Sequence, residues 1–223
     1  AHGVDVLPPD VRRSQEVFSI EDGKVRFGLT AVKHVGRGAA QVIAAAARVA
    51  PFDSLDDFCS RVDLRAANRK TIESLIKAGA MDSLMPGLPI EESRARLMAA
   101  LDDVMGRQAR IKEDLAKGQG LLFGTEAPVA RDRAASPNGA QAAAPWPEHD
   151  LLKAEREVLG FYFSGHPLVR YRERLRCVAT HTIDALNESS PSRVRLAGII
   201  NQVKKVQTRK GDPMGRGVLE DLT

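Results

Sequence analysis

The chain is poor in the residues that build disulfides, metal sites and membrane spans. Its two cysteines, Cys59 and Cys177, lie far apart, and neither belongs to a CxxC pair. Thiols this sparse predict no disulfide framework, and they are typical of a reduced, cytoplasmic protein. The five histidines are scattered, which predicts no structural zinc site. The sequence contains no apolar run of about eighteen residues and no N-terminal signal pattern, so we expect no membrane segment and no membrane partner.

Signatures of catalysis are equally scarce. The sequence holds no NTPase phosphate-binding loop and no Gly-x-Ser-x-Gly motif. The acidic pairs Asp56–Asp57 and Asp102–Asp103 fall on expected helices, where adjacent side chains point apart. Residues 192–223 include no aromatic side chain on which a base could stack. We therefore expect no catalytic residue, no metal and no cofactor in this chain.

The charge balance points weakly to an anionic partner. The formal net charge is +4 and the isoelectric point is near 9.2. Between residues 61 and 70, Asp63 is the only acid in a run of cations, which are Arg61, Arg65, Arg69 and Lys70. This run indicates either a binding surface or an ordinary solvated helix face.

The apolar spacing predicts a mainly α fold that follows a short β region. Residues 17–20 and 24–27 flank a hairpin signal at 21–23. Helical spacing then continues to about residue 117, with Ser54 and Asn68 as helix caps, Gly79 as a left-handed helix end and a long helix from about 91. Further along we expect a helix at 151–159, another opened by Pro167, and strands at 193–200 and 217–222.

Residues 35–38, Val-Gly-Arg-Gly, lie between two expected short helices. Alternate glycines permit a sharp turn and a close approach to a ligand, and the amides that open the next helix suit a phosphate. This layout is typical of a helix-hairpin-helix element, which holds the DNA backbone without reading its sequence. The alternative is a turn that uses glycine only for packing. Residues 54–79 resemble a degenerate second copy, whose turn at 63–67 lacks glycine and is expected to be structural.

The peptide at 119–123, Gln-Gly-Leu-Leu-Phe, lies between the long helix and an Ala/Pro-rich stretch at 124–147. That stretch has few large apolar side chains, so we expect a disordered linker. Two buried side chains of the size of Leu and Phe contribute roughly 1.5–3 kcal/mol each, which predicts a compact docking anchor for a partner. The alternative is that the peptide packs back on its own helix.

Four separated segments, at 6–11, 27–36, 75–84 and 157–168, resemble the family of bacterial replicative DNA polymerase III alpha subunits. The resemblance implies a C-terminal fragment of a longer protein, without the catalytic palm aspartates. It implies the end of the polymerase fingers at 1–26, a tandem helix-hairpin-helix and clamp-binding domain at 27–123, the disordered linker at 124–147, a helical connector at 148–190 and the first strands of an incomplete OB-fold at 191–223.

Together with the hairpin and the basic run, the resemblance implies two binding sites. Residues expected to contact duplex DNA are Lys33, His34, Val35, Gly36, Arg37, Gly38, Arg69 and Lys70. Residues expected to bind the beta sliding clamp are Gln119, Leu121, Leu122 and Phe123. Other replisome subunits are implied as partners. The intact protein would be a DNA-directed DNA polymerase, a nucleotidyltransferase that uses Mg²⁺.

Two other functions fit parts of the sequence. A DNA-repair enzyme built on the same hairpin would need a catalytic carboxylate just past it, and Asp53, Asp56 and Asp57 are the candidates by position. A non-catalytic protein scaffold would show little dependence of duplex affinity on salt, whereas a phosphate binder shows a steep one.

Overall fold

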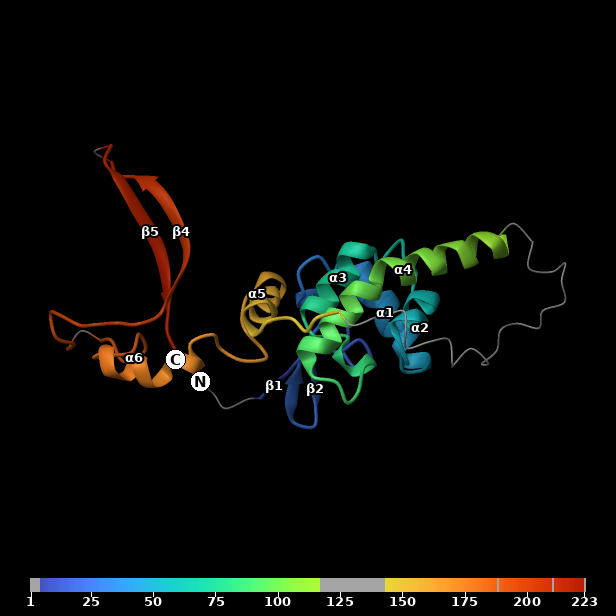
Figure 1. Cartoon of the computed structure of the whole chain (residues 1–223), viewed down its shortest axis with the longest axis horizontal. Helices are drawn as coiled ribbons and strands as arrows, with labels where there is room; N and C mark the ends of the chain where they lie inside the picture. The colour runs from blue at the N-terminus through green and yellow to red at the C-terminus, as the bar shows by residue number, and fades with distance from the viewer. Residues whose placement is uncertain (1–4, 117–142, 188, 210, 223) are drawn as a thin grey trace. The chain divides into compact units, whose positions relative to one another are not determined.

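The computed structural model describes residues 5–116, 143–187, 189–209 and 211–222. The chain forms two compact units, of which one ends at Phe163 and the other begins at Ser164. Figure 1 labels their helices and strands. The main apolar core lies in the first unit and extends from Val11 to Val158. None of the described helices is both long and apolar enough to cross a membrane.

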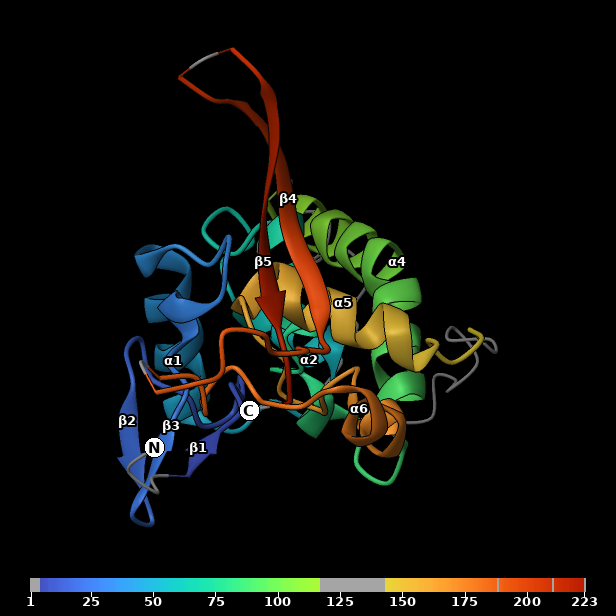
Figure 2. The same ribbon diagram turned by 90° about the vertical axis from the view of Figure 1, so that its left-hand side faces the viewer.

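The β region of the first unit is a small three-stranded sheet. Strands β1 (Val6–Leu7), β3 (Lys24–Arg26) and β2 (Ser19–Glu21) follow one another in that order, with β1 parallel and β2 antiparallel to β3. The predicted hairpin is confirmed, because Asp22 and Gly23 join β2 to β3 at φ 51° and 76°. Positive φ at both turn residues matches the twist of a two-residue hairpin. Figure 2 shows this sheet from a second direction.

Glu21 holds this sheet through two arginines. Its carboxylate accepts hydrogen bonds from Arg26 Nε at 2.7 Å and Arg13 Nη1 at 3.0 Å. The hydrogen bond from Arg26 has the largest effect on this carboxylate. Together the two bonds lower the pKa of Glu21 from 4.5 to about 2. Because the folded-state pKa is lowered, the stabilisation is present above pH 4.5 and is lost as the pH falls through about 2.

We expect Glu21→Gln to be less stable than the natural protein at neutral pH and to lose less stability between pH 4.5 and 2. The reason is that glutamine keeps the shape of the side chain but neither titrates nor pairs with the arginines as an ion. Urea unfolding at a series of pH values measures the difference. Parallel stability curves for the two proteins would contradict the role given to Glu21.

The helical part of the first unit confirms most predicted helix ends. Ser54 Oγ accepts from the Asp57 amide, Asn68 Oδ1 accepts from the Thr71 amide, and Gly79 adopts φ 77°. Helix α4 packs against α2 and α3, and α5 packs against α3 (Figure 1). The predicted end of α4 near residue 117 lies outside the described residues. The elements are η1 (Leu29–Ala31), α1 (Arg37–Val49), α2 (Leu55–Arg61), α3 (Arg69–Lys77), η2 (Asp82–Leu84), α4 (Ile90–Ala116) and α5 (Glu148–Leu159).

The prediction of an α-helix before the glycine loop is wrong, because η1 is a single 3-10 turn. The Val32 amide donates to the Leu29 carbonyl at 3.1 Å. An α-helix would send the Lys33 amide to Leu29 as well. Instead, the Lys33 amide donates to the carbonyl of Val158 in α5 at 2.8 Å. The apolar spacing was still meaningful, since Leu29, Val32 and Val35 are all buried.

The second unit begins with helical turns and ends in a two-stranded ribbon. It contains η5 (Val169–Tyr171) and α6 (Arg172–Val178), followed by the antiparallel strands β4 (Ile199–Gln207) and β5 (Pro213–Glu220). The helix predicted to open at Pro167 therefore begins later, after a turn and η5. The expected combination of a mainly α chain with two strands near its end is confirmed.

The predicted position of the first strand in the ribbon is wrong. The amide of Arg195 donates to Thr180 Oγ1, and its carbonyl accepts from the Thr180 amide, both at 2.9 Å. These bonds hold residue 195 against the segment after α6, so β4 starts at Ile199. It then continues into a charged stretch, where Lys204 lies opposite Arg216. That stretch lacks the apolar alternation by which strands are predicted.

Candidate nucleic-acid interface

The loop that joins η1 to α1 turns at His34 and not at a glycine. His34 adopts φ 67°, in the left-handed region, whereas Gly36 has φ −72°, which any residue can adopt. The Val35 amide donates to the Val32 carbonyl at 3.1 Å, and Thr71 Oγ1 of α3 donates to the His34 carbonyl at 3.0 Å. The expectation that alternate glycines make the turn is therefore wrong.

Gly36 and Gly38 instead leave the start of α1 bare. A Cβ atom added to either glycine would have no neighbour within 4 Å, so packing does not require them. Within the described part of the chain, no side chain caps α1, and its first turn contains no acid. The first amides of a helix lack helical partners and carry the positive end of the helix dipole. The start of α1 therefore offers open N–H donors to an anion.

Two cations, at positions 33 and 37, flank this bare helix end in the sequence. The Lys33 side chain is exposed and forms no ion pair with any described residue. The side chain of Arg37 is 76% exposed and pairs with Glu16. The predicted residue His34 is also exposed, whereas the side chain of Val35 is in the core. Val35 can therefore contribute to a phosphate site only through its backbone.

The other two predicted DNA contacts, Arg69 and Lys70, open helix α3. Arg69 donates to both carboxylate oxygens of Asp102, at 2.6 and 3.0 Å, and its pKa is raised chiefly by this hydrogen bond. Lys70 pairs with Glu73 at 3.3 Å. Exposed ion pairs such as that of Arg69 with Asp102 are weak, so a phosphate can replace the carboxylate. The bond from Thr71 to the hairpin brings the start of α3 close to the loop at His34.

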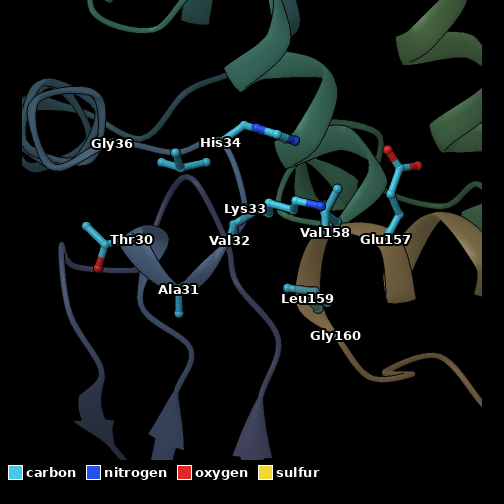
Figure 3. Close-up of a pocket in the computed structure, with 11 residues that line it drawn as sticks. Thr30, Ala31, Val32, Lys33, His34, Gly36, Glu157, Val158, Leu159 and Gly160 are labelled. Carbon is cyan, nitrogen blue, oxygen red and sulfur yellow. The ribbon is translucent and has the colours of Figure 1, made fainter. Parts of the chain in front are cut away.

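A hollow of about 690 Å³ lies beside the hairpin. Residues 30–36 form one wall, and Glu157 to Gly160, at the end of α5, form the other (Figure 3). No local sequence pattern places α5 in the site. The only indication in the sequence was that residues 157–168 resemble the polymerase family, because no spacing rule connects residue 158 with residue 33.

Two of the three carboxylates proposed for a repair enzyme, those of Asp56 and Asp57, have structural partners. Asp57 Oδ2 accepts from the Asp53 amide at 3.1 Å and from Arg61 Nη1 at 2.9 Å. Both oxygens of Asp56 accept from Arg107, at 2.8 and 3.0 Å. Over the described residues, no group of three or more potential ligands is placed to hold a metal ion. The geometry of these acids therefore gives the repair alternative no support.

The cysteine near these acids is also unsuited to catalysis. Cys59 is fully buried in α2, and burial raises the pKa of its thiol to about 12. A thiol in this state is a poor nucleophile, because the reactive form is the thiolate.

The predicted clamp-binding residues Gln119, Leu121, Leu122 and Phe123 lie outside the described residues. The structure shows what stands on either side of them. Helix α4 is described up to Ala116, and the Trp146 amide donates to the carbonyl of Glu91, near the beginning of the same helix, at 3.1 Å.

Comparison with known proteins places this geometry in a family. A helix-hairpin-helix motif model matches residues 3–97, which contain both the glycine loop and the α2–α3 pair. The whole chain is 38% identical to DNA polymerase III subunit alpha of Thermus aquaticus and covers 17% of that protein. It is 34% identical to the Vibrio cholerae subunit, over 98% of the chain and 18% of the relative. The Bacillus subtilis subunit is 32% identical over 99% of the chain, which covers 19% of it.

The chain thus spans less than a fifth of the length of these relatives, and the similarity extends over nearly all of its own residues. The predicted resemblance is confirmed: the chain belongs to the family of DNA polymerase III alpha subunits and corresponds to one segment of them.

Proposed function

We propose that this segment holds duplex DNA by its phosphate backbone and connects a replicative polymerase to its sliding clamp. The observation that carries the proposal is the bare start of α1, where two glycines without packing neighbours expose uncapped amides beside Lys33 and Arg37. Contacts of this kind reach phosphates and no base edges, so the grip is independent of DNA sequence.

In this proposal the segment binds duplex DNA and the clamp, and the catalytic chemistry belongs to the longer protein. In that protein the reaction is template-directed nucleotidyl transfer with Mg²⁺. The acids considered above, Asp56 and Asp57, are paired with Arg107 and Arg61. Additional replisome subunits are the other partners in the proposal.

The clamp contact rests on the peptide at 119–123. Leu122 and Phe123 would enter an apolar pocket of the clamp, and Gln119 would hydrogen-bond at its rim. Two modest contacts on one molecule raise the effective concentration of the second, so the polymerase stays on DNA without a single very tight bond.

A salt series tests the duplex contact directly. Fluorescence anisotropy with labelled duplexes of unrelated sequence should give equal affinities at each salt concentration. The logarithm of the binding constant should fall linearly with the logarithm of salt, by about 0.9 for each phosphate that is neutralised. A flat dependence would favour the protein-scaffold alternative.

We expect the triple variant Gln119→Ala, Leu122→Ala, Phe123→Ala to abolish binding to the clamp, because it removes the hydrogen-bonding and apolar groups of the anchor together. Calorimetric titration with purified clamp measures the loss. Circular dichroism and duplex titration serve as controls and should stay unchanged. Undiminished clamp affinity in the variant would remove the peptide from the proposal.

A further inference from the structure

We propose that α5 is a positioning element for the DNA-binding hairpin, with Val158 as its central residue. The inference rests on the proposed duplex contact and adds to it a part of the chain that the family model does not include. That model matches residues 3–97, whereas α5 spans Glu148–Leu159.

The contact between α5 and the hairpin is made by the backbone. The Lys33 amide donates to the Val158 carbonyl at 2.8 Å, which ends η1 after one turn and directs the chain into His34. The left-handed conformation of His34, at φ 67°, is unfavourable for a residue with a side chain. It persists only where neighbouring structure determines it. Two neighbours do so here. The Val158 carbonyl accepts from the amide of Lys33, the residue before His34, and Thr71 Oγ1 donates to the His34 carbonyl at 3.0 Å.

Helix α5 can serve as a support because it is itself fixed to the core. Glu155, at 0% exposed, accepts hydrogen bonds from Arg94 Nη1 at 2.7 Å and from the Phe163 amide at 2.8 Å. Lys77 Nζ of α3 pairs with Glu157 at 3.0 Å. These contacts hold the last two turns of α5 against α3 and α4, so the Val158 carbonyl faces Lys33 from a fixed position.

The end of α5 also shapes the space beside the hairpin. Gly160 ends the helix in the left-handed region, at φ 86°, and lines the hollow together with Val158 and Leu159. Figure 3 shows Lys33 and the last turn of α5 on facing sides of this hollow. A shift of α5 would therefore change where the loop presents the start of α1, even while the rest of the core stays folded.

A matched pair of core substitutions tests the role of α5. Val158→Ala and Val104→Ala both remove two methyl groups from buried valines, which are 2% and 3% exposed. Val104 lies on α4, and no described hydrogen bond connects it with the hairpin. Both variants should show a similar decrease of stability in urea, and both should remain folded in the binding buffer.

Only Val158→Ala should weaken duplex binding, by about threefold to tenfold, the range expected for one loosened hydrogen bond. Its salt slope should become shallower by about 0.9 for each phosphate that the variant no longer neutralises. Hydrogen exchange at the Lys33 amide should also accelerate in this variant alone. A merely structural role for α5 would change none of these three readouts relative to Val104→Ala.

A second pair avoids any change in core packing. Gly160→Ala and Gly87→Ala both place a Cβ atom in open space at a glycine with φ 86°, a backbone conformation that is unfavourable for a residue with a side chain. Only Gly160→Ala should reduce duplex affinity and flatten the salt slope.

Unchanged duplex binding in both Val158→Ala and Gly160→Ala would overturn the inference. It would also be overturned if the control variants, Val104→Ala and Gly87→Ala, lost as much duplex affinity as the α5 variants. Absence of salt-dependent duplex binding by the natural chain would overturn the proposed function itself. The two failures are therefore distinguishable.

Discussion

Arg94→Met is expected to lower the free energy of unfolding by about 3–5 kcal/mol, the usual cost of removing one partner from a buried ion pair. Arg94 is 3% exposed and holds two carboxylates. Its Nη1 donates to Glu155 at 2.7 Å, and its Nη2 and Nε donate to Asp82 at 2.8 and 3.0 Å. Methionine fills much of the same space but removes the guanidinium from buried Glu155 and partly buried Asp82.

Urea unfolding of the variant measures this loss, and its pH dependence supplies a check. Burial already raises the pKa of Asp82, although the bound Arg94 opposes the rise. Without Arg94, Asp82 should take up a proton more readily as the pH falls. The deficit of the variant should therefore be largest at neutral pH and should shrink in acid.

The double variant Arg94→Met, Glu155→Gln is the control for this prediction. It also neutralises one of the two acids that Arg94 holds and should recover part of the lost stability. A loss below about 1 kcal/mol in the single variant would show that the network is no more valuable than a surface pair.

Gly38→Asp is expected to reduce duplex affinity by at least about tenfold without destabilising the fold. A Cβ atom at this position has no neighbour within 4 Å, and an acid in the first turn of α1 suits the helix dipole. A carboxylate about 4 Å from a bound phosphate costs roughly 1–4 kcal/mol, depending on exposure to solvent, and each 1.4 kcal/mol is about a factor of ten. Binding and stability should therefore respond in different directions.

The matched control is Gly106→Asp, in the exposed part of α4. This glycine also has open space around its Cβ position, and the substitution changes the net charge equally. It should reduce duplex affinity much less than Gly38→Asp, because the added charge lies one helical turn from Asp102, the partner of Arg69, and not at the start of α1. Equal decreases for the two variants would show that net charge, and not the start of α1, governs binding.

The features that could be predicted from the sequence are local ones. Ser54 and Asn68 cap helices because a short polar side chain can reach an amide three residues ahead, and sequence spacing encodes that reach. The hairpin at Asp22 and Gly23 is encoded in the same way. The prediction for the glycines of the hairpin loop was correct only in part, because they leave amides bare while His34 makes the turn.

The features that could not be predicted depend on partners remote in sequence. Nothing near Leu29 indicates that the Lys33 amide bonds to Val158, so helical spacing suggested a longer helix than the single turn of η1. In the ribbon, Lys204 belongs to no apolar pattern and joins β4 through the antiparallel pairing with β5, although the like-charged Arg216 lies opposite. Tertiary hydrogen bonds outweighed local preference in both places.

The bond from Trp146 to Glu91 brings the chain back to the start of α4, the helix from whose other end it departs at Ala116. Beyond Trp146, Arg94 of α4 and Lys77 of α3 hold α5 against the rest of the first unit. If the chain is divided between residues 116 and 146 and the two parts are expressed separately, we expect them to associate and to bind duplex DNA. Evolution could likewise lengthen or shorten the connection while the hairpin keeps its support from α5.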